Sequence, residues 1–493
     1  MFDKLRMFIL NFIKSNKEYP LIALIASGLY PILYYYASNY GHANSFKHLA
    51  FFVFLFIALP YISLILLRLV FNKVSFLKPY RNRLIAILNV FCFSVFILIA
   101  TSGLNTLKVL SCVAGAILFG IVLHKHIKKL VVFQYFMAFV ALFWVAPNVY
   151  ESLTSSTKWM QQPDAIENVK LIKTPNIYII QPDGYANFSE LKKGHYAFNN
   201  SEFEGFLAAN QFTLYDDFRS NYFSTLSSNA SMFAMKHHYY NNAKYSNVEP
   251  LFTRGVIAGD NLVVDIFKRN GYATHLILES EYLISNKPKL KYNDSNIAID
   301  EVSYLSKGFE IKRDVISDLE KAIENQTNSS HFYFIEKILP GHIAQSRFNN
   351  LGKEKERTAY LDNLEKANQW LKKIIKTITN KDKNCLIVIV ADHGGFVGMN
   401  SIYEAKIKQD DPDLVKSVFA SALAIKWPED DMYSGEIKTS VNLFRTLFSY
   451  LSNDTSYLNH LEEDASYLAI RKKAPFGVYK AIDENGKVVF EKK

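Results

Sequence analysis

Cysteine is scarce in this sequence, with only Cys92, Cys112 and Cys385 among 493 residues. The first two lie in long apolar runs, so Cys385 is alone in the polar part of the chain and no disulfide can form within that part. An extracytoplasmic location is not excluded, because a domain of about 300 residues buries enough core to be stable without disulfides.

Zinc-finger spacings, RNA-binding signatures, internal repeats and low-complexity tracts are also absent. The formal net charge is +10, but a basic balance suits a protein beside an anionic membrane as well as one that binds nucleic acid. Because the basic residues near the N-terminus stand between apolar spans, we expect a membrane protein and no nucleic-acid partner.

Hydrophobicity is distributed very unevenly along the chain. Residues before about 150 are mostly Leu, Ile, Phe, Val, Ala and Tyr, whereas residues after about 165 have the charge density of a soluble protein. Runs near ~20 apolar residues predict membrane-spanning helices. Five are expected: Tyr19–Ser38, His48–Leu67, Leu84–Leu104, Val109–Leu123 (the shortest) and Leu130–Val149. The predicted organisation is a transmembrane domain at 1–150, a polar juxtamembrane linker at 151–174 and a soluble domain at 175–493.

Lysine and arginine in the short loops predict the orientation of these spans. The N-terminal tail, the second loop and the fourth connection are rich in them, whereas the other two loops hold only Lys47 and Lys108. We therefore expect a cytoplasmic N-terminus and, with five spans, a domain after Val149 that faces outward. No intramembrane charged cluster marks a transport path; the helices either only anchor the chain or also help to bind a lipid.

The soluble part alternates short apolar runs with helical patterns, which predicts an α/β domain with a mainly parallel central sheet. Residues 354–377 have the spacing of an amphipathic helix, and 476–491 resemble a hairpin. The predicted strands are 176–181, 273–278, 331–338, 384–391 and 420–426.

Metal-ligand residue types follow two of these strands: Asp183 follows the first, and Asp392 and His393 follow the fourth. In such sheets ligands bind beyond the carboxyl ends of the strands. Two carboxylates and an imidazole suit Zn²⁺ or Mn²⁺. Asp-His-Gly alone is more often an ordinary turn, but its position after a strand, together with a second such acid, favours a metal site.

The segments Asn176–Asn187 and Asn384–Gly395 resemble the two metal-bearing strands of sulfatase-like and phosphodiesterase-like members of the alkaline-phosphatase superfamily. The resemblance covers most of residues 175–450. It implies an α/β domain of the alkaline-phosphatase type in which Asp183, Asp392 and His393 hold a metal ion.

The same resemblance implies a nucleophile, and Thr225 follows Asp183 by about forty residues. The segment Phe223–Phe233 resembles the Ser-Thr segment of bacterial phosphoethanolamine transferases, so Thr225 is the expected nucleophile and fourth metal ligand. A helix that begins there would direct its amides at a phosphate, and a bound metal would activate the hydroxyl. Ser224 and Ser227 are rivals, and a Ser-rich helix cap is the structural alternative.

Sulfatases themselves need a Cys/Ser-x-Pro-x-Arg motif, which this sequence lacks. Many family members also have a further histidine near the last strand, and the matching stretch 418–427 has none. The resemblance therefore implies phosphoryl chemistry with one divalent ion, Zn or Mn, similar to lipoteichoic acid synthase-like proteins.

Three further residues are expected to contact substrate. His342 stands in a segment that resembles the histidine-bearing segment of phosphoethanolamine transferases, and it is expected to bind phosphate or to protonate the leaving oxygen. Arg219 and Lys236 flank the nucleophile and are expected to bind phosphate. A loop histidine and a solvated basic face are the alternatives.

The resemblance as a whole implies a multi-pass enzyme of the bacterial inner membrane with a periplasmic or extracellular catalytic domain. It would transfer a phosphoethanolamine- or phosphoglycerol-type group from a phospholipid donor to an envelope glycan or lipid through a phosphothreonine. A phosphodiesterase or phosphatase of the same fold, and an inactive relative that binds an envelope partner, remain alternatives. The transferred group, the acceptor and the oligomeric state do not follow from the sequence.

Overall fold

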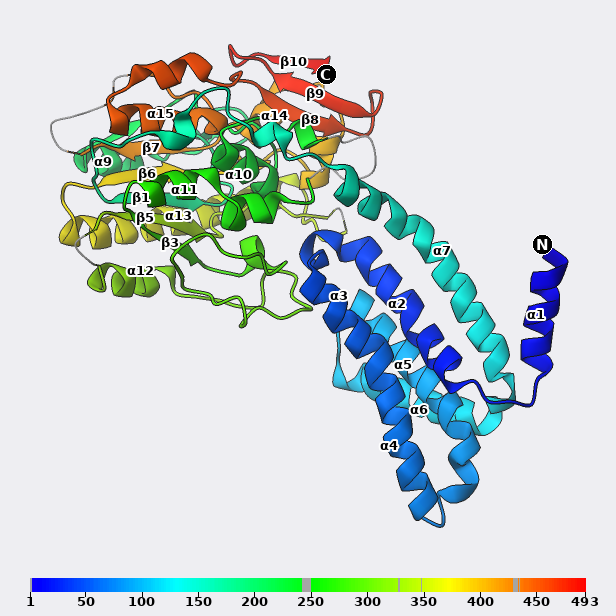
Figure 1. Cartoon of the computed structure of the whole chain (residues 1–493). Helices are drawn as coiled ribbons and strands as arrows, with labels where there is room; N and C mark the ends of the chain where they lie inside the picture. The colour runs from blue at the N-terminus through cyan, green and yellow to red at the C-terminus, as the bar shows by residue number, and fades with distance from the viewer. Residues whose placement is uncertain (1, 242–249, 327–328, 347, 429–432, 434) are drawn as a thin grey trace. The chain divides into compact units, whose positions relative to one another are not determined.

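The computed structural model describes residues 2–241, 250–326, 329–346, 348–428, 433 and 435–493. The chain divides into two compact units, Met1–Thr154 and Ser155–Lys493. In Figure 1 the first unit consists of helices and the second contains strands and helices.

The helices of the first unit are α1 (Phe2–Lys14), α2 (Pro20–Ala43), α3 (Phe46–Val53), α4 (Leu59–Lys73), α5 (Leu84–Thr101), α6 (Thr106–Val122) and α7 (Ile127–Thr154). Four helical segments among the described residues are long and apolar enough to cross a membrane: Pro20–Ala43, Phe46–Lys73, Lys78–Thr101 and His124–Thr154. The apolar α6 has 17 residues, a length of about 26 Å. The predicted helical bundle is confirmed, with four membrane-length helices among the described residues and α6, the fourth predicted span, as a shorter apolar helix.

Two buried amides join helices within this unit. Asn89 on α5 and Gln134 on α7 donate to each other's side-chain oxygens at 2.8 and 2.9 Å, and Asn89 also donates to the carbonyl of Ala23 on α2 at 2.6 Å. Paired polar groups of this kind hold apolar helices together where water is absent.

In the second unit, seven strands among the described residues form one sheet in the order β2-β7-β6-β1-β5-β3-β4. Their bounds are β1 (Ile177–Pro182), β2 (Phe212–Leu214), β3 (Ala273–Leu278), β4 (Asp294–Ser295), β5 (His331–Lys337), β6 (Leu386–Val390) and β7 (Leu423–Lys426). The five strands from β6 to β4 are parallel, and β7 runs antiparallel to both of its neighbours. The predicted mainly parallel α/β sheet is thus confirmed.

Both faces of this sheet are buried, because side chains alternate between them along each strand. Tyr178 and Ile180 of β1 belong to one core with the helices α9 (Ser201–Ala209), α12 (Val315–Glu324), α13 (Lys353–Lys381) and α14 (Pro412–Phe419). Ile177 and Ile179 belong to the opposite core with α10 (Thr225–Ala234), α11 (Leu262–Arg269) and α15 (Ser440–Ser452).

The structure differs from the expected elements in three places. The short strands β2 and β4 were not predicted, and β8 (Ser466–Ile470) pairs with the expected hairpin β9 (Gly477–Ile482) and β10 (Val488–Lys492) in a second sheet. The segment expected to be a linker is divided: its first residues continue α7 to Thr154, and Ile166 and Val169 are buried in the core of the second unit.

Candidate active site

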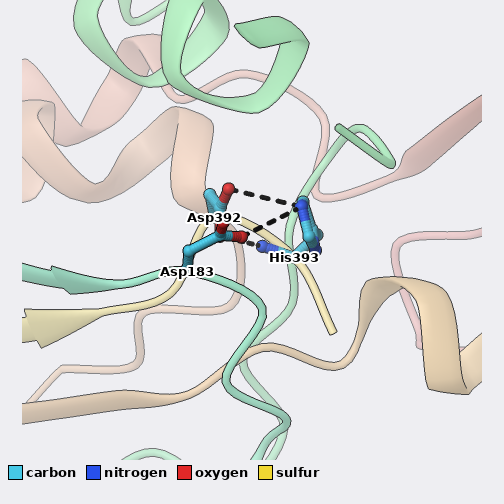
Figure 2. A group of neighbouring side chains, drawn as sticks. All are labelled: Asp183, Asp392 and His393. Carbon is cyan, nitrogen blue, oxygen red and sulfur yellow. Dashed lines mark hydrogen bonds and ion pairs between the residues drawn. The ribbon is translucent and has the colours of Figure 1, made fainter. Parts of the chain in front are cut away.

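The predicted metal ligands follow neighbouring strands. Asp183 comes directly after β1, and Asp392 and His393 follow β6, which pairs with β1 in parallel. The chain turns sharply after Asp183, where Gly184 has a φ of +67° and a Cβ atom would stand 2.2 Å from the carbonyl oxygen of Gly341. Only glycine fits this turn. The sheet order therefore brings the three side chains together, as Figure 2 shows.

The three side chains converge on a common point. His393 Nε2 lies 3.4 Å from Asp392 Oδ2 and 3.6 Å from Asp183 Oδ1, and the ligand atoms of this group lie within 4.8 Å of one another. Neither of those carboxylate oxygens has a hydrogen-bond partner among the described residues, although both are buried. Buried polar atoms without partners are unfavourable, so these oxygens have the character of ligands.

Hydrogen bonds fix the remaining atoms of two of these side chains. His393 Nδ1 lies 2.8 Å from the carbonyl oxygen of Gly394; a carbonyl only accepts, so Nδ1 carries the proton and the lone pair of Nε2 faces the carboxylates. Asp392 Oδ1 accepts from the amides of Gly184 and His393, both at 3.0 Å. The turn after Asp183 and the turn at Asp392 and His393 are thereby joined to each other.

Electrostatics at this point favour a bound cation. Burial and the neighbouring Asp392 raise the pKa of Asp183 to about 7, while His393 opposes the shift. Two carboxylates in a water-poor site repel each other unless a positive charge lies between them. Two oxygens and one imidazole nitrogen fit one divalent ion of the Zn or Mn type.

Thr225 is the first residue of α10, and its Oγ1 lies 3.4 Å from His393 Nε2. The structure therefore brings the fourth predicted ligand to the same point. The rival hydroxyls have other roles: Ser224 caps α10, with its Oγ accepting from the amide of Ser227 at 3.4 Å, and Ser227 is fully buried. Thr225 remains half-buried at the helix N-terminus, where the helix dipole favours an anion.

Tyr360 on α13 fastens both of the turns that follow β1 and β6. Its hydroxyl donates to the carbonyl of Gly184 at 2.9 Å and accepts from the amide of Ala186 at 3.0 Å. Its ring packs so closely on Gly395 that a Cβ there would meet it at 2.3 Å. Tyr360 thus sets the position of the turn after Asp183 and of the turn after His393.

His342 follows β5, the other neighbour of β1, and its ring centroid lies 6.0 Å from that of His393. Its Nδ1 lies 2.7 Å from the carbonyl of Ile343 and so carries the proton. The side chain is exposed to solvent, but desolvation by the surrounding protein together with the nearby His393 lowers the pKa of His342. Its neutral imidazole stands beside the metal-ligand group with Nε2 available as a proton acceptor.

The other predicted phosphate contacts have structural partners. Arg219 donates to the carbonyl oxygens of Asp464 and of Asp483, the latter at 2.9 Å, and Lys236 forms an ion pair with Glu462. The side chains of Arg219 and Lys236 thus have partners in this C-terminal segment, and no hydrogen bond or ion pair joins them to the metal-ligand group among the described residues. The segment lies more than 200 positions away in the sequence, which is why local sequence did not reveal it.

Two buried side chains near the metal-ligand group were missed. Gln181 on β1 and Glu336 on β5 are register partners on the same face, and both have side-chain atoms without partners in the described structure. Burial, followed by Asp183 and Asp392, raises the pKa of Glu336 well above its ordinary value. A polar residue inside an otherwise apolar strand was the only available signal.

The fold and this group of side chains define an α/β domain with a candidate metal site at the carboxyl ends of adjacent parallel strands. The family model described as Sulfatase matches residues 190–452. The chain belongs to the sulfatase family. The matched region contains Thr225, His342, Asp392 and His393, and Asp183 precedes it.

No curated protein matches the chain. Similar solved structures include the C-terminal periplasmic domain of EcEptC from Escherichia coli, at 12% identity and a TM-score of 0.42, covering 64% of this chain and 95% of that one. The integral membrane lipooligosaccharide phosphoethanolamine transferase A from Neisseria meningitidis has 13% identity and a TM-score of 0.42, covering 88% and 95%. The lipoteichoic acid synthase LtaP from Listeria monocytogenes has 14% identity and a TM-score of 0.40, covering 66% and 91%.

Proposed function

We propose that the chain is a membrane-anchored, metal-dependent phosphotransferase. It moves a phosphoethanolamine- or phosphoglycerol-type group from a phospholipid to an envelope glycan or lipid, with Thr225 as the residue that carries the group. Zn or Mn would be held by Asp183, Asp392, His393 and Thr225.

One observation supports this proposal above the others. The hydroxyl of Thr225 lies 3.4 Å from the same His393 nitrogen that faces the two partnerless carboxylate oxygens. A hydroxyl beside a candidate metal site and at the start of a helix has the arrangement of a nucleophile that a bound ion would activate. A protein that only binds a partner has no need of this combination.

The reaction would proceed in two displacements. In the first, Thr225 Oγ1 forms a bond to phosphorus while the bond from phosphorus to the glycerol oxygen breaks, and diacylglycerol leaves. The proton lost by Thr225 is balanced by the proton that the glycerol oxygen gains, and in this proposal neutral His342 carries it. In the second, an acceptor hydroxyl attacks phosphorus, and Thr225 is released with its proton restored.

The bound divalent ion would lower the pKa of the Thr225 hydroxyl and neutralise charge on the phosphoryl oxygens. The chain's own contribution is to hold this point rigid: Tyr360 fixes the two turns, and the Gly394 carbonyl fixes the tautomer of His393.

The apolar helices of the first unit support a phospholipid donor, because they would keep the enzyme at the bilayer where that donor is found. The distribution of Lys and Arg supports a cytoplasmic N-terminus and an outward-facing catalytic domain in a bacterial inner membrane.

Intact-mass analysis of the full chain tests the proposal. Wild type and Thr225→Ala are loaded with Zn or Mn, mixed with phosphatidylethanolamine or phosphatidylglycerol and quenched within seconds, and released diacylglycerol is measured. We expect a metal-dependent adduct on wild type only, and its mass identifies the group. Diacylglycerol release without transfer to any acceptor would support the alternative function, a phosphodiesterase or phosphatase of the same fold. Metal-loaded wild type that gives neither adduct nor diacylglycerol contradicts the proposal.

A further inference from the structure

A cavity of about 530 Å³ lies in the second unit beside the turn that joins β9 to β10. This volume is within the range of small-molecule sites, about 300–1,000 Å³. Its lining includes Tyr215, Arg219, Lys416, Lys438 and Asn485. None of these residues belongs to the group around Asp183 and His393, so the cavity is a separate feature of the domain.

The charges that line this cavity nearly balance. Lys438 lies 3.2 Å from Glu436, and Lys193 lies 3.7 Å from Glu190. The other charged lining residues are the acids Asp216, Asp217 and Glu484 and the bases Arg219 and Lys416. Charges of opposite sign in nearly equal number produce little net field. The cavity therefore does not attract a strongly charged ligand, and its polar lining does not suit a purely apolar one.

Arg219 strengthens this conclusion. One terminal nitrogen of its guanidinium donates to the backbone carbonyls of Asp464 and Asp483, and the other donates to the backbone carbonyl of Asp217 at 3.5 Å. Because both terminal nitrogens already have acceptors, the guanidinium is not free to bind a phosphate in a bidentate manner. The side chain is 6% exposed, and its Nε–H has no partner among the described residues. Most of its hydrogen-bonding capacity is thus used within the protein.

A polyhydroxylated ligand matches these features best. Each sugar hydroxyl both donates and accepts, so it can use the carboxylates, the ammonium groups and the carboxamide of Asn485 together. Tyr215 in the lining is an aromatic residue, and an aromatic ring can provide an apolar surface for a sugar ring to lie against. A bare anion would satisfy only the donors, and a cation only the acceptors.

The cavity is built on the same framework as the metal-ligand group. Asn187, four residues after Asp183, donates through its amide to the carbonyls of Tyr215 and Phe218 at 3.0 and 3.1 Å. The turn at Gly394 packs on the carbonyl of Ala420, another lining residue, where a Cβ would come to 3.0 Å.

A buried segment also joins the cavity to the proposed nucleophile. Residues Ser220, Asn221 and Tyr222 lie between Arg219 and the Ser224 cap of α10, and all three are fully buried. A ligand in the cavity therefore contacts Arg219, which is directly followed by the buried segment that leads to Thr225.

We propose that this cavity is a carbohydrate-binding site and that it holds a sugar of the acceptor glycan. The assignment as acceptor rests on the proposed function; the binding of a sugar does not. In this proposal the enzyme has two separate sites. The group around Asp183 and His393 transfers the phosphoryl-bearing group, and the cavity binds a sugar of the acceptor and so selects it.

The test uses the full chain in lipid nanodiscs that contain no glycoside detergent. Cellobiose, maltose and chitobiose are the probes, with inorganic phosphate as the anionic comparison, and binding is measured by saturation-transfer NMR and calorimetry. Lys416→Ala removes a donor from the cavity, Asn485→Trp fills it from an exposed turn, and Lys366→Ala is the matched control at an exposed lysine of α13 outside the lining.

We expect at least one disaccharide to bind wild type and Lys366→Ala equally, and to bind both cavity variants at least tenfold more weakly while their melting temperatures stay unchanged. The proposal is overturned if wild type binds none of the three sugars, if the cavity variants bind as wild type does, or if phosphate binds in their place. The phosphothreonine adduct reports separately on the proposed function: an adduct without sugar binding removes only this inference, and sugar binding without an adduct removes only the acceptor role.

Discussion

The two ends of the parallel strands differ in how their polar side chains are satisfied. At the amino end, Asn176 donates to Asp382 at 2.8 Å and accepts from the amide of His331 at 2.8 Å, and Gln326 donates to the hydroxyl of Tyr333 at 2.9 Å. At the carboxyl end, oxygens of Asp183 and Asp392 are buried without partners among the described residues.

This difference separates stability from function along the same strands. A buried polar atom left without a partner is unfavourable by about 1–3 kcal/mol. Asn176 and Gln326 at the amino end avoid this penalty, whereas Asp183 and Asp392 at the carboxyl end accept it beside the proposed nucleophile. Polar groups at the carboxyl end are therefore expected to serve a ligand, and those at the amino end to serve the fold.

The largest expected effect comes from a matched pair of acids, one at each end. Asp392→Asn keeps the Oδ1 that accepts from Gly184 and His393 but removes the charge that faces His393. We expect diacylglycerol release to fall by about 10³-fold or more, with no loss of thermal stability in the metal-free protein. Asp382→Asn at the amino end should keep normal release, and equal losses in the two variants would remove the distinction between the ends.

The metal-free protein should respond to pH through Asp183. Burial and Asp392 raise its pKa from 3.8 to about 7, so between these values the native state holds a proton that the unfolded state has lost. The contribution of Asp183 to the free energy of unfolding is therefore fully present below pH 4. It is lost as the pH rises through 7, and the loss is several kcal/mol at most.

Thermal unfolding of the metal-free full chain between pH 4 and 8 measures this dependence, with Asp183→Asn as the control that removes it. Adding Zn or Mn should abolish the loss at high pH, because the ion stabilises the ionised carboxylate. A wild type and an Asp183→Asn variant with the same pH profile would contradict the buried, partnerless state of this acid.

A smaller effect is expected from the hydroxyl of Tyr360, which fixes the turn after Asp183. Tyr360→Phe keeps the ring packing on Gly395 but loses the bonds to Gly184 and Ala186. We expect metal affinity to weaken about tenfold, the lower range for residues that orient ligands, as measured by competition with a chelating dye. Tyr333→Phe, which loses a tyrosine hydroxyl at the amino end, should leave metal affinity unchanged.

The smallest effect concerns stability alone. Asn176→Ala removes two hydrogen bonds at the amino end, and about 2 kcal/mol of stability should be lost with them. The melting temperature of the full chain, followed by scanning fluorimetry, should fall by a few degrees while metal affinity stays normal. Weakened metal binding in this variant would show that the two ends are coupled.

Sequence could predict the strands that carry the ligands because β1, β5 and β6 are apolar on both faces and therefore appear as short continuous apolar runs. Asp183 and Asp392 stand out because each is a charged residue directly after such a run. The short strands β2 and β4, of three and two residues, carry no such pattern and exist only through pairing with neighbours.

The roles of other polar residues depend on partners distant in the sequence. Arg219 and Lys236 looked like phosphate contacts beside the nucleophile, but Glu462 and the carbonyl of Asp464 engage them. His238 lies close to Lys236 in the sequence and also has its partners within the domain. It is buried, donates to the carbonyl of Ser227 and accepts from the amide of Tyr240, and burial lowers its pKa to about 3.

The most direct test of the central claim is metal analysis of the purified full chain after equilibration with Zn or Mn and removal of loosely bound ions. The account predicts about one ion per chain in wild type and none in an Asp183→Asn, Asp392→Asn double variant. Wild type without a bound ion, or a double variant that binds as much as wild type, would contradict the assignment of the partnerless oxygens at the carboxyl end as metal ligands.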